Sequence, residues 1–441
     1  MYDVIIVGAG PAGLFAAYEL SKTDKKVLLI EKGKAIKDRP RSEVMCGVGG
    51  AGTFSDGKLH FSPVLSHEKM FHIWGVDEYQ EVVNYVDQTF VDFGDNSEYY
   101  PKGDGKFEKL VETCKKNGIH LVHRKNRHVG TDKLPIIIGK FEESLRENGI
   151  EIMTESTAND IIVENNEIKG VICNGENILA KQVILSPGRF NASWMQNLAK
   201  KYSIPYKYDK VEVGVRVEFP SGIMREIAEI QYDSIFLIQT PTYDNVMRTF
   251  CVCPCGFVGA EDYEGFVCVN GHSNSHHDSE NSNFAFVQEI SLTEPLENTT
   301  KYAKSIAKLT NTIGGGKPLI QRYADLKNGR RSTWERIKKS HVTPSLKDVV
   351  PGDIAMGFPH RLVTNIKEGL EILDKVMPGI ASGDTLLYAP EIKLRSSKIE
   401  TDKHLRTFIK GLSVAGDGAG VSGNIIGAAV TGVIAARGLD L

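Results

Sequence analysis

The sequence has few cysteines, and their spacing does not suggest a disulfide framework. The seven cysteines are an odd number, and apart from one cluster they are scattered over the 441 residues. Such cysteine usage is typical of a chain kept in a reducing compartment. Met1 stands one residue ahead of the first predicted strand, so we expect no signal or transit peptide. The sequence therefore predicts a cytoplasmic protein.

Long apolar runs and an excess of basic charge are also missing. No uninterrupted apolar run reaches the length of about 18 residues that spans a bilayer, and the stretch 425–436 is too short. The chain has 53 Lys and Arg against 56 Asp and Glu, a net charge of −3. We therefore expect no transmembrane segment and no nucleic-acid partner. The length is enough for about two or three domains with a large core.

The first 31 residues carry a complete nucleotide-binding pattern. Residues 2–7 (YDVIIV) predict a buried parallel strand, 8–13 (GAGPAG) follow at once, and 14–21 predict a helix. Residues 26–30 (KVLLI) predict a second strand that ends at Glu31. A G-x-G-x-x-G turn between strand and helix, with an acid after the next strand, is the fingerprint of a dinucleotide site.

Each part of this pattern has a mechanical role. Gly8 makes the tight turn, Gly10 lets the backbone approach a pyrophosphate, and Gly13 allows close packing of helix on strand. The helix N-terminus offers free N–H groups and a partial positive charge to the phosphates. Glu31 is placed to accept hydrogen bonds from a ribose diol and to repel a 2′-phosphate. No second unit of this kind occurs, so we expect no dedicated NAD(P)H domain.

The C-terminal segment points to FAD as the dinucleotide. Residues 412–415 (LSVA) predict a short strand that leads into Gly416-Asp417-Gly418-Ala419-Gly420 and then into the apolar stretch 425–436. This segment resembles the second FAD fingerprint of flavoproteins of the glutathione-reductase type. The resemblance implies that Asp417 holds the ribityl and phosphate region. It also implies that the backbone at Asn424 and Ile425 faces the isoalloxazine, where a helix N-terminus favours anionic reduced flavin.

A glycine-rich loop lies between these two fingerprints. Five glycines stand in the eleven residues 47–57, which excludes a regular helix or strand and suits a backbone lying flat against a ligand. The run GVGGAGTFSDGKL resembles the signature of a family of bacterial and archaeal uncharacterised FAD-dependent dehydrogenases, distant relatives of geranylgeranyl reductases. The resemblance implies that Gly50 to Lys58 wraps the flavin and pyrophosphate, with Arg41 and Lys58 as partners. Only Cys46 precedes the loop, where family members often have paired cysteines.

The middle of the chain completes the predicted FAD domain. Residues 150–188 predict strands that end in Ser186-Pro187-Gly188. This end resembles the turn that closes such a domain beside the cofactor. The family resemblance also implies a backbone contact to adenine near Ala158. We expect an α/β fold: a discontinuous Rossmann-type domain over 1–62, 134–195 and 385–441, a mostly helical insertion over 63–133, and an α+β substrate domain over 196–384. The predicted cofactor contacts are Gly8, Gly10, Pro11, Ala12, Gly13, Glu31, Lys32, Arg41, Gly50, Ala51, Gly52, Ser55, Lys58, Ala158, Ser186, Gly188, Gly416, Asp417, Gly423, Asn424 and Ile425.

The expected substrate domain contains a cluster of cysteines. Residues 211–219 alternate like a strand, with Arg216 and Glu218 on one face, and 248–257 resemble a Thr-Phe-Cys-x-Cys-Pro segment of the same family. On a strand, Cys251, Cys253 and Cys255 would share a face. Three interpretations stay open: these cysteines line the flavin cavity, they are packing residues, or with Cys268 they ligate a metal or an iron–sulfur cluster. The close spacing disfavours ligation.

Two polar segments supply the remaining candidates. The loop 272–284 holds three histidines and two acids, so it is either a metal site or, by the resemblance, a loop near the substrate pocket. In 388–397, Arg395 is expected to bind a carboxylate substrate or the flavin O2/N1 region, or else to form a buried ion pair with Glu391. The weak catalytic candidates are Ser55, Asp56, Cys253, His277, Glu391 and Arg395, and we predict no metal.

Together these features predict an FAD-dependent oxidoreductase that passes hydride between flavin N5 and a small organic substrate, with C=C reduction as one chemistry. NAD(P)H bound transiently, or a redox protein, is the expected electron partner. Two alternatives remain: a flavin-dependent amine or amino-acid oxidase, and a non-catalytic FAD-binding module.

Overall fold

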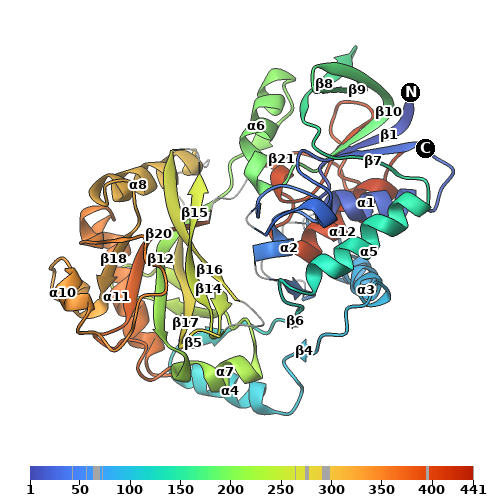
Figure 1. The fold of residues 1–441 in the computed structure, drawn as a ribbon. Coiled ribbons are helices and arrows are strands. Elements are labelled where there is room, and N and C mark those ends of the chain that lie inside the picture. The colour runs from blue at the N-terminus through green and yellow to red at the C-terminus, as the bar shows by residue number, and fades with distance from the viewer. Residues whose placement is uncertain are drawn as a thin grey trace. The chain divides into compact units, whose positions relative to one another are not determined.

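The computed structural model describes residues 1–41, 43–55, 57–62, 70–71, 73–263, 265–273, 278–290, 298–393 and 397–440. The chain divides into two compact units (Figure 1). Unit 1 comprises Met1–Glu98, Arg124–Asp209 and Arg395–Leu441, and unit 2 comprises Tyr99–His123 and Lys210–Leu394.

Unit 1 is built on a mostly parallel sheet in the order β7-β2-β1-β10-β9-β8, with β22 on the free side of β10. Strands β1, β2, β7 and β22 run parallel, whereas β8, β9 and the start of β10 form an antiparallel arm. The strands are β1 Tyr2–Val7, β2 Val27–Ile30, β3 Lys58–His60, β6 Asn126–His128, β7 Glu151–Met153, β8 Ala158–Glu164, β9 Glu167–Cys173, β10 Glu176–Leu185, β11 Tyr206–Lys207, β21 Lys398–Ile399 and β22 Leu412–Val414. This confirms the predicted Rossmann-like α/β fold.

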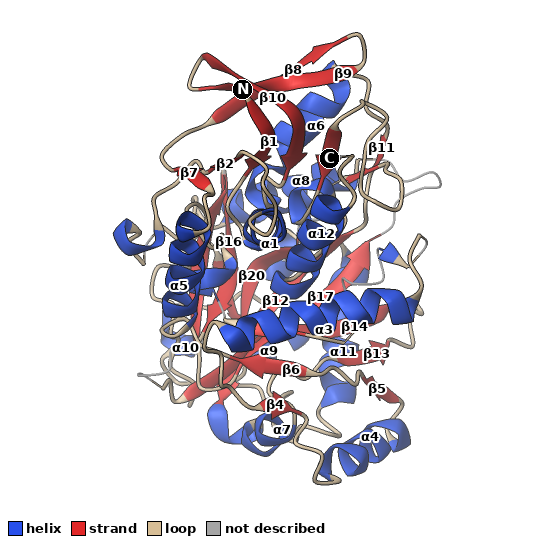
Figure 2. Ribbon diagram, turned by 90° about the vertical axis from the view of Figure 1, so that its right-hand side faces the viewer, coloured by secondary structure: helices blue, strands red, loops and turns tan. Residues whose placement is uncertain are grey.

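The helices of unit 1 pack on this sheet around one apolar core. They are α1 Pro11–Leu20, α2 Gly52–Ser55, α3 Val76–Asp92, α5 Leu134–Glu147, α6 Ala192–Lys201 and α12 Ile425–Arg437. Helices α1 and α12 lie side by side (Figures 1 and 2), although they come from opposite ends of the chain. Their approach is so close that a Cβ on Gly432 would stand 2.0 Å from the carbonyl oxygen of Ala12. The two ends of the chain are therefore joined in one core.

Unit 2 is organised around a larger sheet in the order β19-β18-β20-β12-β17-β14-β13-β5, together with the hairpin β15–β16. Its strands are β4 Tyr99–Tyr100, β5 Ile119–Leu121, β12 Val211–Pro220, β13 Phe236–Gln239, β14 Val246–Cys253, β15 Phe257–Tyr263, β16 Phe266–His272, β17 Asn281–Ile290, β18 Leu319–Arg322, β19 Val350–Pro351 and β20 Leu386–Lys393. Its helices are α4 Lys106–Lys116, α7 Arg225–Ile230, α8 Thr299–Ile313, α9 Tyr323–Lys327, α10 Trp334–Ile337 and α11 His360–Leu373.

The central strand β12 is buried on both faces, which is unusual for an alternating sequence. The odd-numbered apolar side chains, such as Val213, Val215 and Val217, belong to the main apolar cluster of unit 2. The even-numbered Arg216 and Glu218 share the opposite face, as predicted, and both are 0% exposed. That face is therefore polar and buried at once, so its charges need partners inside the protein.

The unit boundaries differ from the domain boundaries expected from the sequence. The stretch 63–133 is not a separate insertion, because it is divided between the two units. Helix α3 places Val83, Val86 and Phe90 in the core of unit 1, while β5 pairs with β13 in unit 2. These assignments depend on contacts between residues far apart in the sequence, so local composition did not indicate them.

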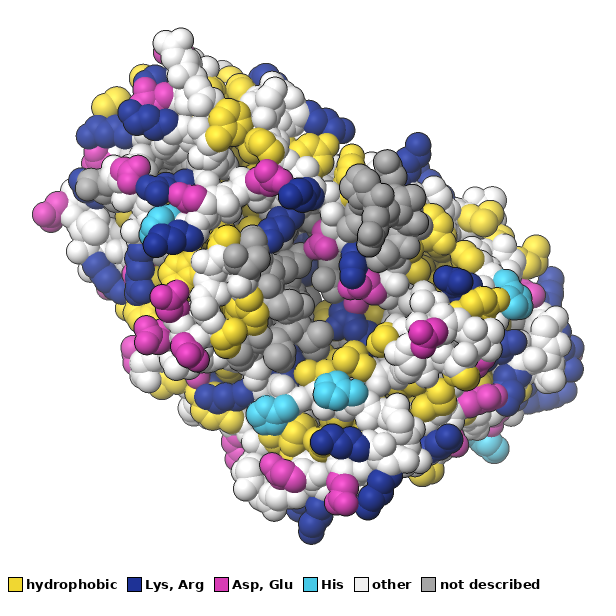
Figure 3. Space-filling view, turned by 180° about the vertical axis from the view of Figure 1, so that it is seen from behind, with side chains coloured by type: hydrophobic (Ala, Val, Ile, Leu, Met, Phe, Trp, Pro, Cys, Tyr) yellow, Lys and Arg dark blue, Asp and Glu magenta, His cyan; other side chains and the backbone are white. Residues whose placement is uncertain are grey.

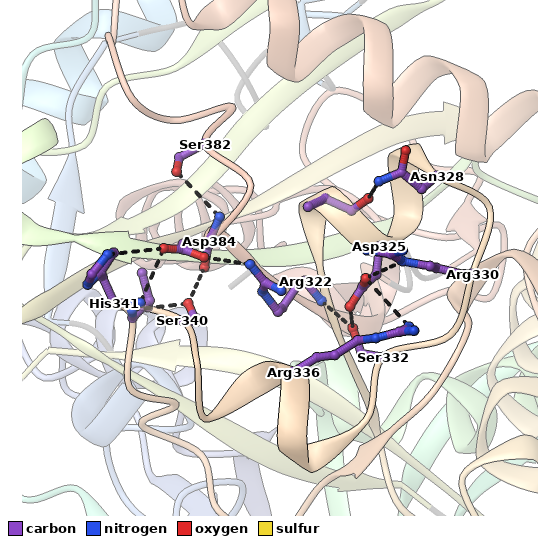
Figure 4. Close-up of polar contacts among 12 residues, drawn as sticks. Arg322, Asp325, Asn328, Arg330, Ser332, Arg336, Ser340, His341, Ser382 and Asp384 are labelled. Atoms are coloured by element: carbon purple, nitrogen blue, oxygen red, sulfur yellow. Dashed lines mark hydrogen bonds and ion pairs between the residues drawn. The ribbon is translucent and has the colours of Figure 1, made fainter.

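A polar network fastens the segment that follows β18 onto unit 2 (Figure 4). The buried carboxylate of Asp325 lies 2.8 Å from Arg330 Nε and accepts a hydrogen bond of 2.7 Å from Ser332 Oγ. Arg322 Nη2 donates to Asp384 at 2.7 Å, and the backbone N–H of His341 also donates to Asp384 at 3.2 Å. These contacts pair both carboxylates with neighbouring cations, so the network is structural.

Among the helices of the described residues, none is both long and apolar enough to cross a membrane. On the face of the molecule seen in Figure 3, basic and acidic side chains are interspersed, in keeping with the nearly balanced composition.

Candidate functional site

The glycine-rich turn after β1 adopts the geometry that its sequence predicts. Gly8 has φ 98°, which only glycine adopts readily, and a Cβ there would stand 2.3 Å from the carbonyl oxygen of Ser186. A Cβ on Gly13 would stand 1.8 Å from the oxygen of Gly8. Helix α1 begins at Pro11, three residues before the predicted start, because proline at the first helical position already has a helical φ.

The carboxylate of Glu31 is buried and bound by three backbone N–H groups. Oε2 accepts from Ala9 at 2.8 Å, while Oε1 accepts from Gly33 at 2.8 Å and from Gly47 at 3.0 Å. One side chain therefore joins the turn after β1, the end of β2 and the loop that begins near Cys46. Oε2 keeps a lone pair for a further donor, which suits the ribose hydroxyl expected there.

Arg39 holds the same loop from the other side, and the sequence analysis missed it in favour of Arg41. Its buried guanidinium donates to the carbonyl oxygens of Glu43 (3.0 Å), Val44 (2.7 Å), Gly47 (3.3 Å) and Val48 (2.9 Å). Burial lowers the pKa of Arg39, an effect that Glu31 opposes. One sequence signal could have indicated this role of Arg39: it is a basic residue beside a glycine-rich loop that has few polar side chains to bind its own backbone.

Three segments far apart in the sequence converge beside Gly10. The N–H of Gly49 donates to the oxygen of Ala9 at 2.9 Å, and a Cβ on Gly50 would stand 3.1 Å from Gly10 Cα. A Cβ on Gly52 would stand 2.6 Å from a side-chain carbon of Ile425 at the start of α12. The structure thus brings together the G-x-G-x-x-G turn, the glycine-rich loop and the C-terminal fingerprint.

The C-terminal fingerprint is held by side chains on both sides of the turn. Asp417 accepts from Arg189 Nη2 at 2.8 Å and from Ser422 Oγ at 2.5 Å. Asn424 caps α12, because its Oδ1 accepts from the N–H of Gly427 at 2.8 Å. The N-terminus of α12, which begins at Ile425, carries a partial positive charge.

Unit 1 presents open backbone and unpaired polar groups at this point, as a bound dinucleotide would need. Asn424 Nδ2 and Thr53 Oγ1 are buried without a hydrogen-bond partner in the protein, which is costly unless another molecule supplies an acceptor. A Cβ on Gly10 would meet only Gly50 Cα, at 3.9 Å, and a Cβ on Gly188 would meet nothing within 4 Å. The residues therefore fit a group that lies against the backbone at Gly10 and Gly188.

The other predicted cofactor contacts differ in how far they are buried and in which elements they belong to. Lys32 and Arg41 are exposed, whereas Lys58 is buried at the start of β3. Ala158 opens β8, two residues after Ser156, whose N–H donates to the oxygen of Glu31 at 2.9 Å. Ser186 Oγ donates to the oxygen of Val7 at 2.9 Å. Pro11, Ala12, Ala51, Gly416 and Gly423 lie on the same turns, and α2 ends at Ser55, whose side chain lies outside the described part of the structure.

The catalytic candidates are only partly described. Asp56, His277 and Arg395 lie outside the described residues. Cys253 and Glu391 meet in unit 2, where the buried guanidinium of Arg216 lies 3.3 Å from Cys253 Sγ and 3.8 Å from Glu391 Oε2. Glu391 also lies 2.6 Å from Lys393 Nζ, so its ion pairs in the described structure are with Arg216 and Lys393.

The cysteine cluster does not form the single face that strand alternation predicts. A bulge between Phe250 and Cys253 interrupts the pairing of β14 with β17, Cys251 has φ 47°, and β14 ends at Cys253. Cys255, with φ 48°, lies in the turn beyond the strand. Among the described residues, no group of three or more His, Cys, Asp or Glu side chains is placed to hold a metal ion.

Comparison with known families accounts for most of the chain. Residues 6–89 match a NAD(P)-binding Rossmann-like domain, 62–210 an FAD binding domain, and 210–394 an FAD-dependent protein, C-terminal domain-like. The third range coincides with the long segment of unit 2.

Individual relatives are more distant. A protein of Clostridium beijerinckii, described as uncharacterized, is 26% identical over 466 residues, which cover 97% of this chain and 79% of the relative. D-amino acid dehydrogenase of Helicobacter pylori is 23% identical over 319 residues, which cover 56% of this chain and 73% of that protein. Digeranylgeranylglycerophospholipid reductase of Methanococcus vannielii is 57% identical over only 35 residues, 8% of this chain and 9% of that protein.

The fold, the converging turns and the family matches define a flavoprotein with a Rossmann-like FAD-binding domain. The protein is an FAD-dependent oxidoreductase.

Proposed function

We propose that this chain belongs to the family of uncharacterised FAD-dependent dehydrogenases whose glycine-rich signature its loop resembles. FAD bound to unit 1 would supply hydride transfer at N5 to or from an organic substrate, with C=C reduction among the chemistries to be tested. The observation that carries the proposal is the convergence of three segments at Gly10, next to two buried donors without protein partners.

The residues of unit 1 have separate roles in this proposal. The open backbone at Gly10 lets the pyrophosphate approach the N-terminus of α1. Glu31 Oε2 accepts one ribose hydroxyl while its other bonds hold the loop in place. Asn424 Nδ2 and Thr53 Oγ1 offer hydrogen bonds to the cofactor, and the N-terminus of α12 stabilises negative charge on the flavin.

Oxidation of an amine or amino acid is the second candidate function. The similarity to D-amino acid dehydrogenase over 73% of that protein's length favours it. The match to the geranylgeranyl-type reductase covers too little of either chain to favour C=C reduction in the same way.

The substitution Gly10→Ala tests the cofactor site. Gly10 has an ordinary φ of −72°, and the new methyl group would meet no protein atom closer than 3.9 Å, so the fold should be kept. The methyl group would occupy the space of the pyrophosphate, and we expect FAD affinity to fall at least tenfold. The control Gly222→Ala, at a glycine with nothing within 4 Å of its Cβ, should bind FAD normally. Equal affinity in both variants would contradict the proposed site.

The reaction class is tested by following the flavin absorbance without oxygen. Bleaching by NADH or NADPH would indicate a nucleotide-dependent reductase, and bleaching by D-amino acids would indicate the second candidate. Re-oxidation by oxygen with release of peroxide would indicate an oxidase. A flavin that none of these reduces would favour a non-catalytic module.

A further inference from the structure

The strand β12 carries a fully buried cation at the centre of unit 2. The side chain of Arg216 is 0% exposed, and removing a guanidinium from water costs several kcal/mol unless close partners replace the water. Its space is fixed, because a Cβ on the adjacent Gly271 would stand 1.6 Å from Arg216 Nη2. The groups that contact Arg216 must therefore compensate its positive charge inside the protein.

Most partners of Arg216 are neutral. Nε donates to Asn283 Oδ1 at 2.7 Å, and Nη2 donates to the carbonyl oxygen of Cys251 at 2.7 Å and to Cys253 Sγ at 3.3 Å. Nη1 has no hydrogen-bond acceptor, although Glu391 Oε2 lies 3.8 Å away. Among the described residues, the guanidinium thus has one carboxylate partner, Glu391, and that carboxylate is 3.8 Å away.

The same carboxylate also serves a second buried cation. Lys393 Nζ lies 2.6 Å from Glu391 Oε1 and donates to Asn270 Oδ1 at 3.3 Å. Burial opposes the charge on Lys393, but Glu391 outweighs that effect and the pKa of Lys393 is raised, so it stays an ammonium ion. In the described part of this region, two buried cations therefore share one carboxylate.

The part-exposed thiol of Cys251 also lies near Arg216 and Lys393, and it is the one other sulfur of the described residues that acts on both cations. The remaining described titratable groups supply little compensation. Burial, and then Arg216, lowers the pKa of His272, which keeps that ring neutral. Glu261 on β15 is partly exposed to water, and Arg248 is already paired with Glu212 at 2.5 and 2.7 Å. Cys268 is a buried thiol whose pKa burial raises well above its usual value.

The bulge in β14 directs sulfur toward this cluster. Because the register shifts between Phe250 and Cys253, the carbonyl of Cys251 and the sulfur of Cys253 reach the same nitrogen of Arg216. A cation in hydrogen-bond contact with sulfur in a low dielectric favours thiolate over thiol.

We propose that Cys253 is a thiolate in the folded protein, a second negative charge beside Arg216, and thus a nucleophilic sulfur for small uncharged electrophiles. This goes beyond the proposed flavin chemistry and does not depend on it. The competing arrangement is a neutral thiol that donates to the carbonyl of Cys251, 3.5 Å away.

Cys268 is a matched control within the same unit. Cys253 and Cys268 are 0% and 1% exposed, so reagents and water reach them equally poorly. Only Cys253 has a hydrogen bond from a cation among the contacts of these two sulfurs in the structure. A difference between them therefore reports ionisation rather than access.

The S–H stretching absorption of the holoprotein at neutral pH tests the charge state. If Cys253 is a thiolate, Cys253→Ser removes no S–H band, whereas Cys268→Ser removes one. Loss of a band in both variants would overturn the proposal. In addition, Arg216→Gln should add one S–H band, and if that variant does not fold, the two serine variants still decide the question.

Alkylation by iodoacetamide at pH about 6 tests the reactivity. The sulfur electron pair of Cys253 forms a carbon–sulfur bond, the carbon–iodine bond breaks and iodide leaves, with no proton to remove from a thiolate. Peptide mass spectrometry should show Cys253 labelled at least tenfold faster than Cys268. Labelling of Cys253 at the same rate or more slowly would refute the nucleophile.

Discussion

Two charged side chains, Glu31 and Arg39, hold the segment 43–48 at the start of the glycine-rich loop of unit 1 from opposite sides. Glu31 accepts three backbone N–H bonds, and Arg39 donates to four carbonyl oxygens of the segment 43–48. A loop with so many glycines loses much conformational entropy when it folds, so these two charged side chains supply the order that its own sequence does not.

The substitution Glu31→Gln should weaken both the fold and FAD binding. The amide nitrogen of glutamine would face an N–H donor, and hydrogen bonds to a charged group are each worth about 1.5–3 kcal/mol. We expect the apoprotein to lose about 2 kcal/mol of unfolding free energy and FAD affinity to fall at least tenfold. Glu43→Gln is the control, because the ion pair of Glu43 among the described residues is with the part-exposed Lys34. A normal FAD titration of Glu31→Gln would contradict the role of Glu31.

A second comparison separates Arg39 from Arg41. Lysine at position 39 keeps the charge but loses the planar fork that reaches several carbonyl groups, so Arg39→Lys should lower FAD affinity about tenfold or more. Arg41 is exposed, and Arg41→Lys should leave the affinity unchanged if Arg41 contacts only solvent. Flavin fluorescence titration measures both. A larger effect at Arg41 would instead support the cofactor contact that the sequence predicts for it.

At the scale of elements, the close approach of α1 and α12 makes Gly432 a structural requirement. An alanine Cβ at 2.0 Å from the backbone oxygen of Ala12 would force the helices apart, which costs at least 1–3 kcal/mol. Gly139→Ala in α5 is the matched control, since its Cβ would lie 3.7 Å from Ile36 and alanine is the better helix former. Thermal unfolding should show a clear loss for Gly432→Ala and none for Gly139→Ala. Equal melting temperatures would refute the tight contact.

The Arg322–Asp384 ion pair, which attaches the segment after β18, should make the stability of the fold depend on pH. Burial opposes the charge on Asp384, but the hydrogen bonds from Arg322 and from the N–H of His341 outweigh it and lower the pKa of Asp384 (Figure 4). A carboxylate whose pKa is lower in the folded state stabilises the fold above its unfolded pKa of about 3.9 and loses this contribution as the pH falls. Asp384→Asn should therefore be less stable than the wild type by about 1 kcal/mol at pH 7, with the gap closing below about pH 4. Urea unfolding at both pH values measures the gap, and a constant gap would exclude the ion pair as its cause.

At the scale of the whole molecule, the sequence predicted what is encoded locally and missed what depends on distant contacts. The strand at 2–7, the turn 8–13 and the helix after Asn424 were predicted because each has its own residue pattern. The division of 63–133 between two units depends on pairing of β5 with β13, which no local pattern reveals. The alternation of β12 indicated the shared face of Arg216 and Glu218, but not that both faces are buried.

If one cofactor site is assembled from three distant segments, as we propose, FAD should affect all three of them. A ligand that binds only the folded state stabilises it by RT ln(1 + [L]/Kd), about 2.7 kcal/mol at one hundred times Kd. Because the proposed FAD contacts lie at 8–13, 46–58 and 416–425, FAD should slow amide exchange most strongly in these segments of the apoprotein. Exchange in the centre of β12, where Val213 and Val217 are fully buried and paired with both β17 and β20, should stay slow and unchanged. Hydrogen-exchange mass spectrometry with and without FAD makes this comparison within one sample, so β12 is an internal control. If FAD protected 8–13 but left 46–58 and 416–425 unchanged, the three segments would not share one site, and the predicted contacts of Asn424 and the glycine-rich loop would be wrong.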